Sequence, residues 1–360
     1  REMQLMSKAW HLPWSDIELL QKLDRGAFGE VWRATYRENW DVAVKKMFRT
    51  DTIEEVSNES EIHFLQRVRH PRLVMFIGAG RMLDNNLFLV LEFMEKGSMR
   101  KIIDEDGKSF SWTSRIRILL DVTLGMCYLH GEHNSIHRDL KSQNVLLTMQ
   151  KGRCLSARTQ LSLSLSLSSF TRTQTTHTHT RTGTLRGKVS DFGVSKFMPS
   201  KDGSELDVVE AMQGSDSAQD LNSKLDSEDS IEHGCSTPNS TMKATMTAGC
   251  GTPSHMAPEV WTAMSASLKY KKVVKFSKKV DVYSFGILMW EALELDVPWK
   301  DIKFTFKVAK LVCEGKRPKI STGRGCHGDM RGVSEPNGYV NLMKRCWETN
   351  ASDRPDFEFI

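Results

Sequence analysis

The 360-residue sequence lacks any run of about 18 to 20 apolar residues, the length that a membrane-spanning helix needs. It also lacks an apolar segment behind a basic start, so no secretory signal is visible. Its seven cysteines include no Cys-x-x-Cys pair, which argues against a zinc ribbon and a disulfide scaffold. These absences exclude a membrane channel and a small secreted domain, and they favour a reduced, cytoplasmic protein. Because the chain opens at Arg1-Glu2-Met3, we expect it to be part of a longer one.

What is present is the composition of a globular protein, with 39% hydrophobic and 26% charged residues. The length allows one large two-lobed enzyme or two modest domains. The formal net charge of +5 is unevenly distributed, because two stretches differ from the rest of the chain. We predict that both are insertions and that the remainder is one domain of two lobes.

The first stretch, 152–187, contains five arginines and no acidic residue. Within it Leu161–Ser168 alternates leucine with serine, and Thr176–Thr180 alternates threonine with histidine. Translated dinucleotide repeats produce such alternations in every frame, so we hypothesise a retained intron or a gene-model error. Two alternatives stay open: the period of two also fits a half-buried strand, and His177 and His179 could bind a metal, although two histidines alone make a poor site.

The second stretch, 201–240, carries ten acidic residues against two lysines and has few aromatic residues. Such a composition buries too little apolar surface to offset the entropy of ordering, so we predict a mobile acidic loop. Ser227 and Ser230 lie among acids and could be phosphorylated by an acidophilic kinase, and a solvated tether is the simpler interpretation.

Short apolar runs between turn-forming residues predict five strands near the N-terminus, at 17–23, 30–36, 40–47, 73–78 and 87–93. A helical pattern lies between the third and fourth strands, at 52–68. Beyond Gly97 the apolar period lengthens to about 3.6, and this predicts helices over 114–130, 280–293 and 337–347.

The fold class is therefore α+β, with two lobes: a small five-stranded antiparallel N-lobe with one helix, and a larger, mainly helical C-lobe. The predicted boundaries are a flank at 1–15, the N-lobe at 16–91, a hinge at 92–97 and the C-lobe at 98–360.

Four motifs in a fixed order carry candidate chemistry. Gly26 and Gly29 lie at the first predicted hairpin, where glycine lets the backbone approach a polyphosphate. Lys45 ends the run Val-Ala-Val-Lys on a predicted strand. The run 137–144 reads His-Arg-Asp-Leu-Lys-Ser-Gln-Asn, and Asp191-Phe192-Gly193 follows it. Together these motifs resemble the glycine-rich loop, strand lysine, catalytic loop and magnesium-binding motif of the protein kinases.

Later motifs extend the resemblance over residues 16–360: Met256–Glu259, Asp281–Gly286 and Arg354-Pro355. The catalytic loop and the Trp290-Glu291 pair resemble the tyrosine-kinase-like group, which includes Raf and mixed-lineage types and acts mostly on serine and threonine. Lys141 and the run Gly251-Thr252-Pro253 likewise resemble serine/threonine kinases rather than tyrosine kinases.

The resemblance implies ATP and Mg²⁺ as cofactors. Lys45 would hold the α- and β-phosphates and would itself be fixed by an ion pair with Glu61. Asn144 and Asp191 would bind Mg²⁺ through hard oxygen atoms.

For phosphoryl transfer, the resemblance implies that Asp139 orients the attacking hydroxyl and accepts its proton. Lys141 would neutralise charge on the γ-phosphate, and Thr252 would bridge Asp139 and Lys141. Arg138 would bind a phosphate added to the activation segment by an upstream kinase. The candidate acceptors for that phosphate are Thr241, Thr245 and Thr247.

For the adenine ring, the resemblance implies apolar side chains above and below it, backbone hydrogen bonds from the hinge, and Leu91 as the gatekeeper. The other residues of this set are Val31, Ala43, Leu146, Glu92 and Met94. Glu259 and Arg354 are expected to form an ion pair that supports the C-lobe without a part in the chemistry.

The sequence departs from the family pattern at several places. Asp24 replaces the first loop glycine, and its charge would weaken ATP binding if it faced the phosphates. His255 stands where an aromatic residue is usual, which bears on peptide docking. The insertions lengthen the segments before Asp191 and before Glu259, and surface turns tolerate such length because closure entropy grows slowly.

The sequence suggests two alternative functions of different classes. The first is a cytoplasmic ATP-dependent serine/threonine protein kinase that acts on protein substrates in signalling. The alternative is a catalytically impaired pseudokinase or scaffold, suggested by Asp24, His255 and the insertions. Nucleic-acid binding is disfavoured, because no basic stripe with interleaved aromatic residues is present.

Overall fold

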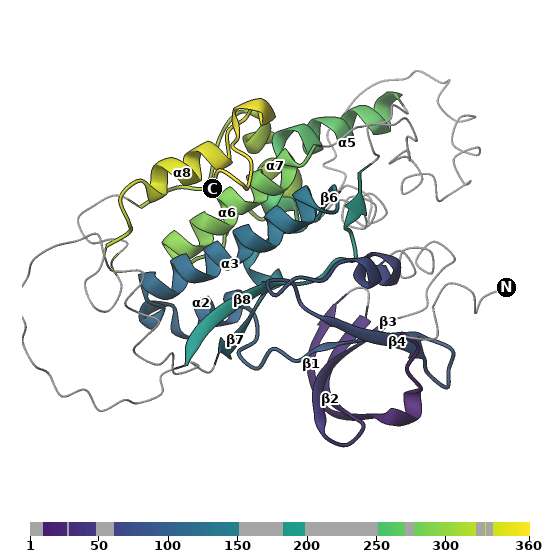
Figure 1. The fold of residues 1–360 in the computed structure, drawn as a ribbon. Coiled ribbons are helices and arrows are strands. Elements are labelled where there is room, and N and C mark those ends of the chain that lie inside the picture. Colours follow the sequence, from purple (N-terminus) through teal and green to yellow (C-terminus); the bar gives the residue numbers. More distant parts are fainter. Residues whose placement is uncertain are drawn as a thin grey trace, which may run out of the picture.

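The computed structural model describes residues 10–26, 29–47, 61–150, 183–198, 251–270, 277–321, 328 and 334–360. They form two lobes, one built on a sheet and one largely helical (Figure 1). Most of the two predicted insertions, and Thr241, Thr245 and Thr247, lie outside the described residues. Among the helices that are described, none is long and apolar enough to span a bilayer.

The N-lobe sheet contains five antiparallel strands, as predicted, and their order in the sheet is β1-β2-β3-β5-β4. Their bounds are β1 Ile17–Gly26, β2 Gly29–Tyr36, β3 Trp40–Met47, β4 Phe76–Arg81 and β5 Leu87–Glu92. The predicted start of the fourth strand at 73 is wrong. Leu73 bridges Val189 in the C-lobe, and the Val74 amide donates to the Val189 carbonyl at 2.8 Å, so these residues connect the lobes before the strand begins.

Side chains alternate between the two faces of this sheet. Val42 and Val44 of β3 belong to a buried cluster on one face. Met47 of the same strand belongs to the larger core, which extends into the C-lobe. Because Ala43 and Lys45 share the parity of Met47, they lie on the face of the sheet that is turned toward the C-lobe.

The predicted boundary between the flank and the domain, at 15/16, leaves out a segment that packs on the N-lobe. The Leu12 amide donates to the Ala79 carbonyl and the Ala79 amide donates to the Trp10 carbonyl, both at 2.9 Å. Leu12 is buried in the N-lobe cluster, and Trp14 packs against Phe88. Residues 10–15 therefore belong to the N-lobe.

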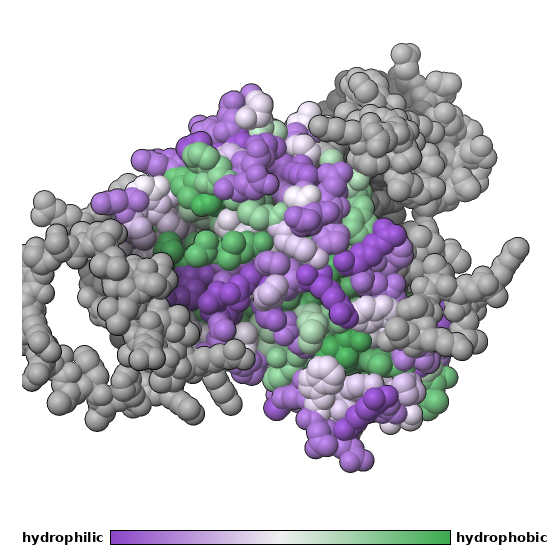
Figure 2. Space-filling model, in the orientation of Figure 1, coloured by the Kyte–Doolittle hydropathy of each residue, from purple (hydrophilic) through white to green (hydrophobic). Residues whose placement is uncertain are grey.

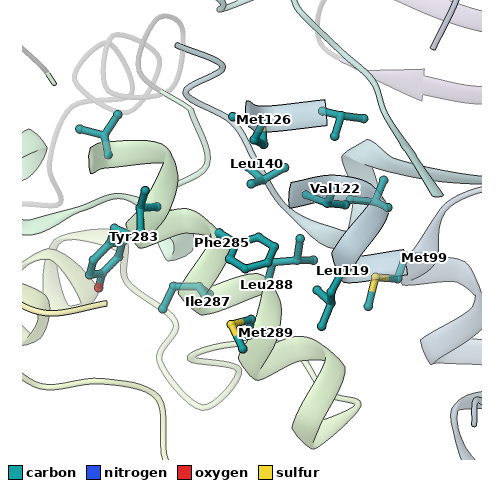
Figure 3. Close-up of a cluster of buried hydrophobic side chains, with 14 of the residues drawn as sticks. Met99, Leu119, Val122, Met126, Leu140, Tyr283, Phe285, Ile287, Leu288 and Met289 are labelled. Carbon is teal, nitrogen blue, oxygen red and sulfur yellow. The ribbon is translucent and has the colours of Figure 1, made fainter. Parts of the chain in front are cut away.

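The C-lobe is built around α6, whose residues from Val280 to Leu293 are all buried. The described helices are α2 Met99–Asp106, α3 Trp112–Gly131, α5 Pro258–Tyr270, α6 Lys279–Glu294, α7 Thr305–Cys313 and α8 Tyr339–Cys346. Side chains of α3 and α6 point toward each other, and Leu140 lies among them (Figure 3). The helices predicted at 114–130, 280–293 and 337–347 are confirmed with small shifts of their ends. In the view of Figure 2, hydrophobic areas of the surface are separated by hydrophilic ones.

Two short antiparallel pairs complete the lobe: β6 Ser135–Ile136 with β9 Lys196–Phe197, and β7 Val145–Gln150 with β8 Thr184–Val189. The last residues of the predicted first insertion, 184–187, belong to β8. Arg186 forms an ion pair at 2.5 Å with the buried Asp121 of α3, which also pairs with Arg72 at 3.0 Å.

Candidate active site

The lysine of β3 is held between two carboxylates. The Nζ atom of Lys45 lies 2.8 and 2.9 Å from the two carboxylate oxygens of Glu61, and 3.3 Å from Oδ1 of Asp191. Glu61 is buried at the start of the described helix 61–67. Burial alone would lower the pKa of Lys45, but the two carboxylates outweigh it and raise that pKa. The charge of Lys45 in turn lowers the pKa of Asp191, whereas burial raises the pKa of Glu61 in spite of the neighbouring lysine.

A side chain of α6 holds the backbone of the catalytic loop in place. Asp281, which is fully buried, accepts hydrogen bonds from the backbone amides of His137 at 2.8 Å and Arg138 at 2.7 Å. Its Oδ2 also lies 2.8 Å from Nε2 of His130 on α3. Arg138 has a φ of 69°, a conformation that costs free energy unless its surroundings enforce it. The paired amide contacts of Asp281 provide that enforcement.

Asp139 lies at the centre of the polar cluster. Its carboxylate lies 2.7 Å from Nζ of Lys141 and accepts the Thr252 amide at 2.7 Å. The Nζ atom of Lys141 also donates to Oγ1 of Thr252 at 2.5 Å, so Thr252 contacts both residues. Gly251 makes this approach possible, because a Cβ atom there would lie 2.2 Å from the Arg138 carbonyl. The structure thus brings Thr252 to two residues, Asp139 and Lys141, that lie more than 100 positions before it in the sequence.

Asn144 and Asp191 are placed side by side by the β7–β8 pair. Asn144 directly precedes β7, and Asp191 follows β8 by one residue, Ser190, whose amide donates to the Asn144 carbonyl at 2.9 Å. The Asn144 amide nitrogen donates to Oδ2 of Asp139 at 3.0 Å, and its Oδ1 accepts no hydrogen bond among the described residues. Asp191 is the more accessible of the two, with 47% of its side chain exposed.

This donor set fits Mg²⁺. One amide oxygen and one carboxylate are hard ligands, and Mg²⁺ ordinarily takes its remaining ligands from water and substrate phosphates. In the described part of the chain, no group of three or more His, Cys, Asp or Glu side chains is arranged to hold a metal ion. Asn144 and Asp191 are therefore suited to a cation that arrives with its nucleotide.

The apolar residues expected around adenine share one face of the sheet. Val31 pairs with Lys45, and Ala43 pairs with Leu91, so all four lie on the face turned toward the C-lobe. Leu146 stands next to the hinge, because the neighbouring residue, 147, donates its amide to the Gly97 carbonyl at 2.8 Å.

Glu92 has a contact that the sequence did not indicate. Its carboxylate accepts two hydrogen bonds from Lys188 of β8, at 2.6 and 2.8 Å, and one from the Met75 amide at 2.7 Å. Met94, two residues further along the hinge, is buried. The side chain of Glu92 therefore links the hinge to the strand that leads to Asp191, and its backbone remains the part suited to a nucleotide.

The glycine-rich turn is described except for residues 27–28. Gly26 pairs with Gly29 across the hairpin. A Cβ atom at Gly29 would lie 2.1 Å from the Lys46 carbonyl, so the close approach of β3 already requires glycine there. Asp24 is exposed, and its Oδ1 accepts the Arg25 amide at 2.7 Å.

A family model described as protein tyrosine and serine/threonine kinase matches residues 17–213 and 239–360. The chain belongs to this kinase family. The membership confirms the resemblance drawn from the motifs, the α+β fold class and a phosphotransferase fold with two lobes.

Similar curated proteins carry kinase names. The serine/threonine-protein kinase VIK of Arabidopsis thaliana is 27% identical over 95% of this chain and 58% of that protein. The serine/threonine-protein kinase CTR1 of the same plant is 27% identical over 100% of this chain and 32% of its own length. The dual specificity protein kinase splA of Dictyostelium discoideum is 27% identical over 98% and 11%. The chain thus spans between 11% and 58% of these relatives.

Proposed function

We propose that the chain is an ATP-dependent serine/threonine protein kinase that transfers the γ-phosphate of ATP to protein hydroxyls. The observation that supports this most directly is that two arrangements are formed at once. Lys45 is paired with Glu61, and Asp139 is held by Lys141, Thr252 and Asn144. Phosphoryl transfer depends mainly on positioning and charge stabilisation, and this cluster supplies both.

Each polar residue has one task in this proposal. Lys45 binds the α- and β-phosphates, and Asn144 and Asp191 hold Mg²⁺, which neutralises charge on the phosphates when bound. Asp139 accepts a hydrogen bond from the acceptor hydroxyl and takes its proton. Lys141 lies beside Asp139 and donates to the γ-phosphate.

Adenine lies between Val31 and Ala43 on one side and Leu146 on the other, with backbone hydrogen bonds from Glu92 to Met94 and Leu91 at the back. The protein substrate presents serine or threonine, and an upstream kinase acts on Thr241, Thr245 or Thr247. The setting is intracellular signalling in the cytoplasm. The relatives' names support the choice of serine and threonine, while the dual specificity name of splA makes tyrosine the natural comparison.

The test is transfer of labelled phosphate from ATP with Mg²⁺ to peptides that differ only in a serine, threonine or tyrosine acceptor. The full chain is compared with a form that joins Gln150 to Thr184 directly and with Asp139→Asn in both. We expect transfer to serine and threonine, and a loss of at least about 100-fold in kcat for Asp139→Asn with unchanged nucleotide binding. The shortened form controls for the insertion.

Three outcomes would contradict the proposal in different parts. Transfer that survives Asp139→Asn in purified protein would overturn the assignment of Asp139 as the residue that takes the proton. Preferred transfer to tyrosine would overturn the hydroxyl specificity. Nucleotide binding without transfer by either form, also after treatment with an activating kinase, would establish the pseudokinase alternative.

A further inference from the structure

A buried histidine, His255, and a buried glutamate, Glu291, connect the activation segment to the catalytic loop. His255 ends the 3-10 turn Pro253–His255, in the activation segment, with 3% of its surface exposed. Glu291 lies near the end of α6, with 1% exposed. The Nε2 atom of His255 lies 3.2 Å from Oε2 of Glu291. Neither residue is among those assigned to nucleotide, metal or hydroxyl.

The same glutamate holds the catalytic loop. Its Oε2 accepts the backbone amide of Ser142 at 3.0 Å, and its Oε1 accepts the Ser142 hydroxyl at 2.7 Å. Ser142 is fully buried and directly follows Lys141. Both oxygens of Glu291 are thus engaged by the loop, and Oε2 is shared between the loop and His255.

The backbone of His255 is also fixed, by hydrogen bonds to Thr252 and to α6. Its backbone amide donates to the Thr252 carbonyl at 2.9 Å, and its carbonyl accepts the Ser284 hydroxyl of α6 at 2.9 Å. Because Thr252 contacts both Asp139 and Lys141, the hydrogen bonds form a closed ring. The ring runs through Asp139, Thr252, His255, Glu291 and Ser142, and the chain closes it from Ser142 back to Asp139.

The charges around the pair keep Glu291 ionised. Burial alone would raise the pKa of Glu291, but His255 and the hydrogen bonds from Ser142 outweigh it and lower that pKa. Arg100 of α2 also faces the pair, because its guanidinium lies 3.6 Å from Oε1 of Glu291, and it binds Asp104 as well. On the opposite side of the imidazole, Nδ1 lies 3.0 Å from the Ser254 hydroxyl. An aromatic ring without nitrogen at 255 would remove one donor from a buried carboxylate, which is costly.

We propose that His255 is a positioning residue for phosphoryl transfer: through Glu291 it fixes Ser142, and with it Asp139 and Lys141, relative to Thr252. It touches neither the nucleotide nor the acceptor hydroxyl. Its removal therefore lowers kcat while the KM for ATP stays nearly constant. The proposal rests on the proposed kinase function for its kinetic consequence, and the ring itself can be measured without activity.

The experiment compares His255→Phe, His255→Gln and Ser142→Ala in the full chain, together with the double variant His255→Phe/Ser142→Ala. The glutamine amide can replace the Nε2 donor, whereas phenylalanine cannot. We expect His255→Phe to lower kcat for peptide phosphorylation by about tenfold or more, the loss of a hydrogen bond to a charged group, with the KM for ATP changed less than about twofold. His255→Gln should restore most of the rate, and the double variant should lose less than the product of the single losses.

The matched control is His133→Phe, which removes a histidine that binds Tyr128 outside the ring. A second readout is hydrogen exchange at the backbone amides of Ser142 and Thr252, both of which donate inside the ring. We expect His255→Phe, and not His133→Phe, to raise exchange at both amides.

The outcomes separate the two proposals. Raised exchange in a chain without transfer activity would leave the positioning ring standing and overturn the kinase function. Unchanged exchange, or a rate loss that glutamine does not restore and that matches a general loss of thermal stability, would overturn the positioning role of His255 whether or not the chain is active.

Discussion

Arg354 shows how a charge is accommodated at the scale of a single residue. Its side chain is completely buried, and it forms a bidentate pair with Glu259 at 2.6 and 2.7 Å. The backbone carbonyls of Lys279, Glu348 and Thr349 accept its remaining donors at 2.9, 2.8 and 3.1 Å. The ion pair expected from the sequence is confirmed. It ties the residue that follows the 3-10 turn Ala351–Asp353 to the start of α5.

Replacing Glu259 by glutamine would leave a buried guanidinium without its counter-charge. We expect the change to lower the free energy of unfolding by about 3 to 5 kcal/mol, the usual cost of removing one partner of a buried pair. Urea unfolding followed by circular dichroism measures it. Glu314→Gln is the matched control, because Glu314 is exposed and lies 3.9 Å from Lys310. Equal stability of Glu259→Gln and the control would show that the pair contributes little.

At the scale of elements, two glycines of β4 allow the N-terminal segment 10–15 to pack closely against the sheet. A Cβ atom at Gly78 would lie 2.6 Å from the Leu12 side chain, and one at Gly80 would lie 2.2 Å from the Leu12 carbonyl. The ring of Trp10 lies against that of Phe76 in β4, with the two ring centroids 5.3 Å apart. The segment 10–15 is therefore an extension of the N-lobe that lies directly against β4.

Gly80→Ala should push this segment from the sheet. We expect a loss of about 1 to 3 kcal/mol in stability, the range for overpacking, with increased protease cleavage N-terminal to Asp16. Gly131→Ala is the control, since its nearest atom would be 4.0 Å away and alanine favours the helix there. A Gly80→Ala protein that matches wild type in both cleavage and unfolding would contradict the tight packing of this segment.

At the scale of the whole molecule, Asp281 links α6, α3 and the catalytic loop. Burial alone would raise the pKa of Asp281, but hydrogen bonds and charge from His130 and His137 outweigh it and lower that pKa. A carboxyl group with a lowered folded-state pKa stabilises the fold above its unfolded pKa. That contribution is lost as the pH falls through the folded value.

The Asp281→Asn variant tests this contribution. The stability difference between wild type and Asp281→Asn should be constant above the ordinary aspartate pKa of 3.8 and should shrink as the pH falls below it. Denaturant unfolding of both proteins from about pH 6 to about pH 3 measures the difference. A difference that stays the same over the whole range would show that the carboxylate charge is not what stabilises the fold.

The sequence by itself determined the family, the two lobes and the identity of the polar residues, because these depend on local order. Periods of two and 3.6 identify strands and helices, and short runs such as 137–144 keep catalytic side chains adjacent in the chain. The third strand, 40–47, has in the structure the bounds predicted for it. The proposed roles of the polar residues depend on the same local runs.

Only the tertiary structure decided which distant residues meet. Leu73 reads as strand from its neighbours, yet its backbone pairs with β8 of the other lobe. Arg186 lies in a stretch of insertion-like composition, yet it forms an ion pair with the buried Asp121 of α3. His255 appeared as a departure from a pattern, and its buried contact with Glu291 shows what the side chain binds. Buried charges pair through space, and no local period of the sequence encodes those pairs.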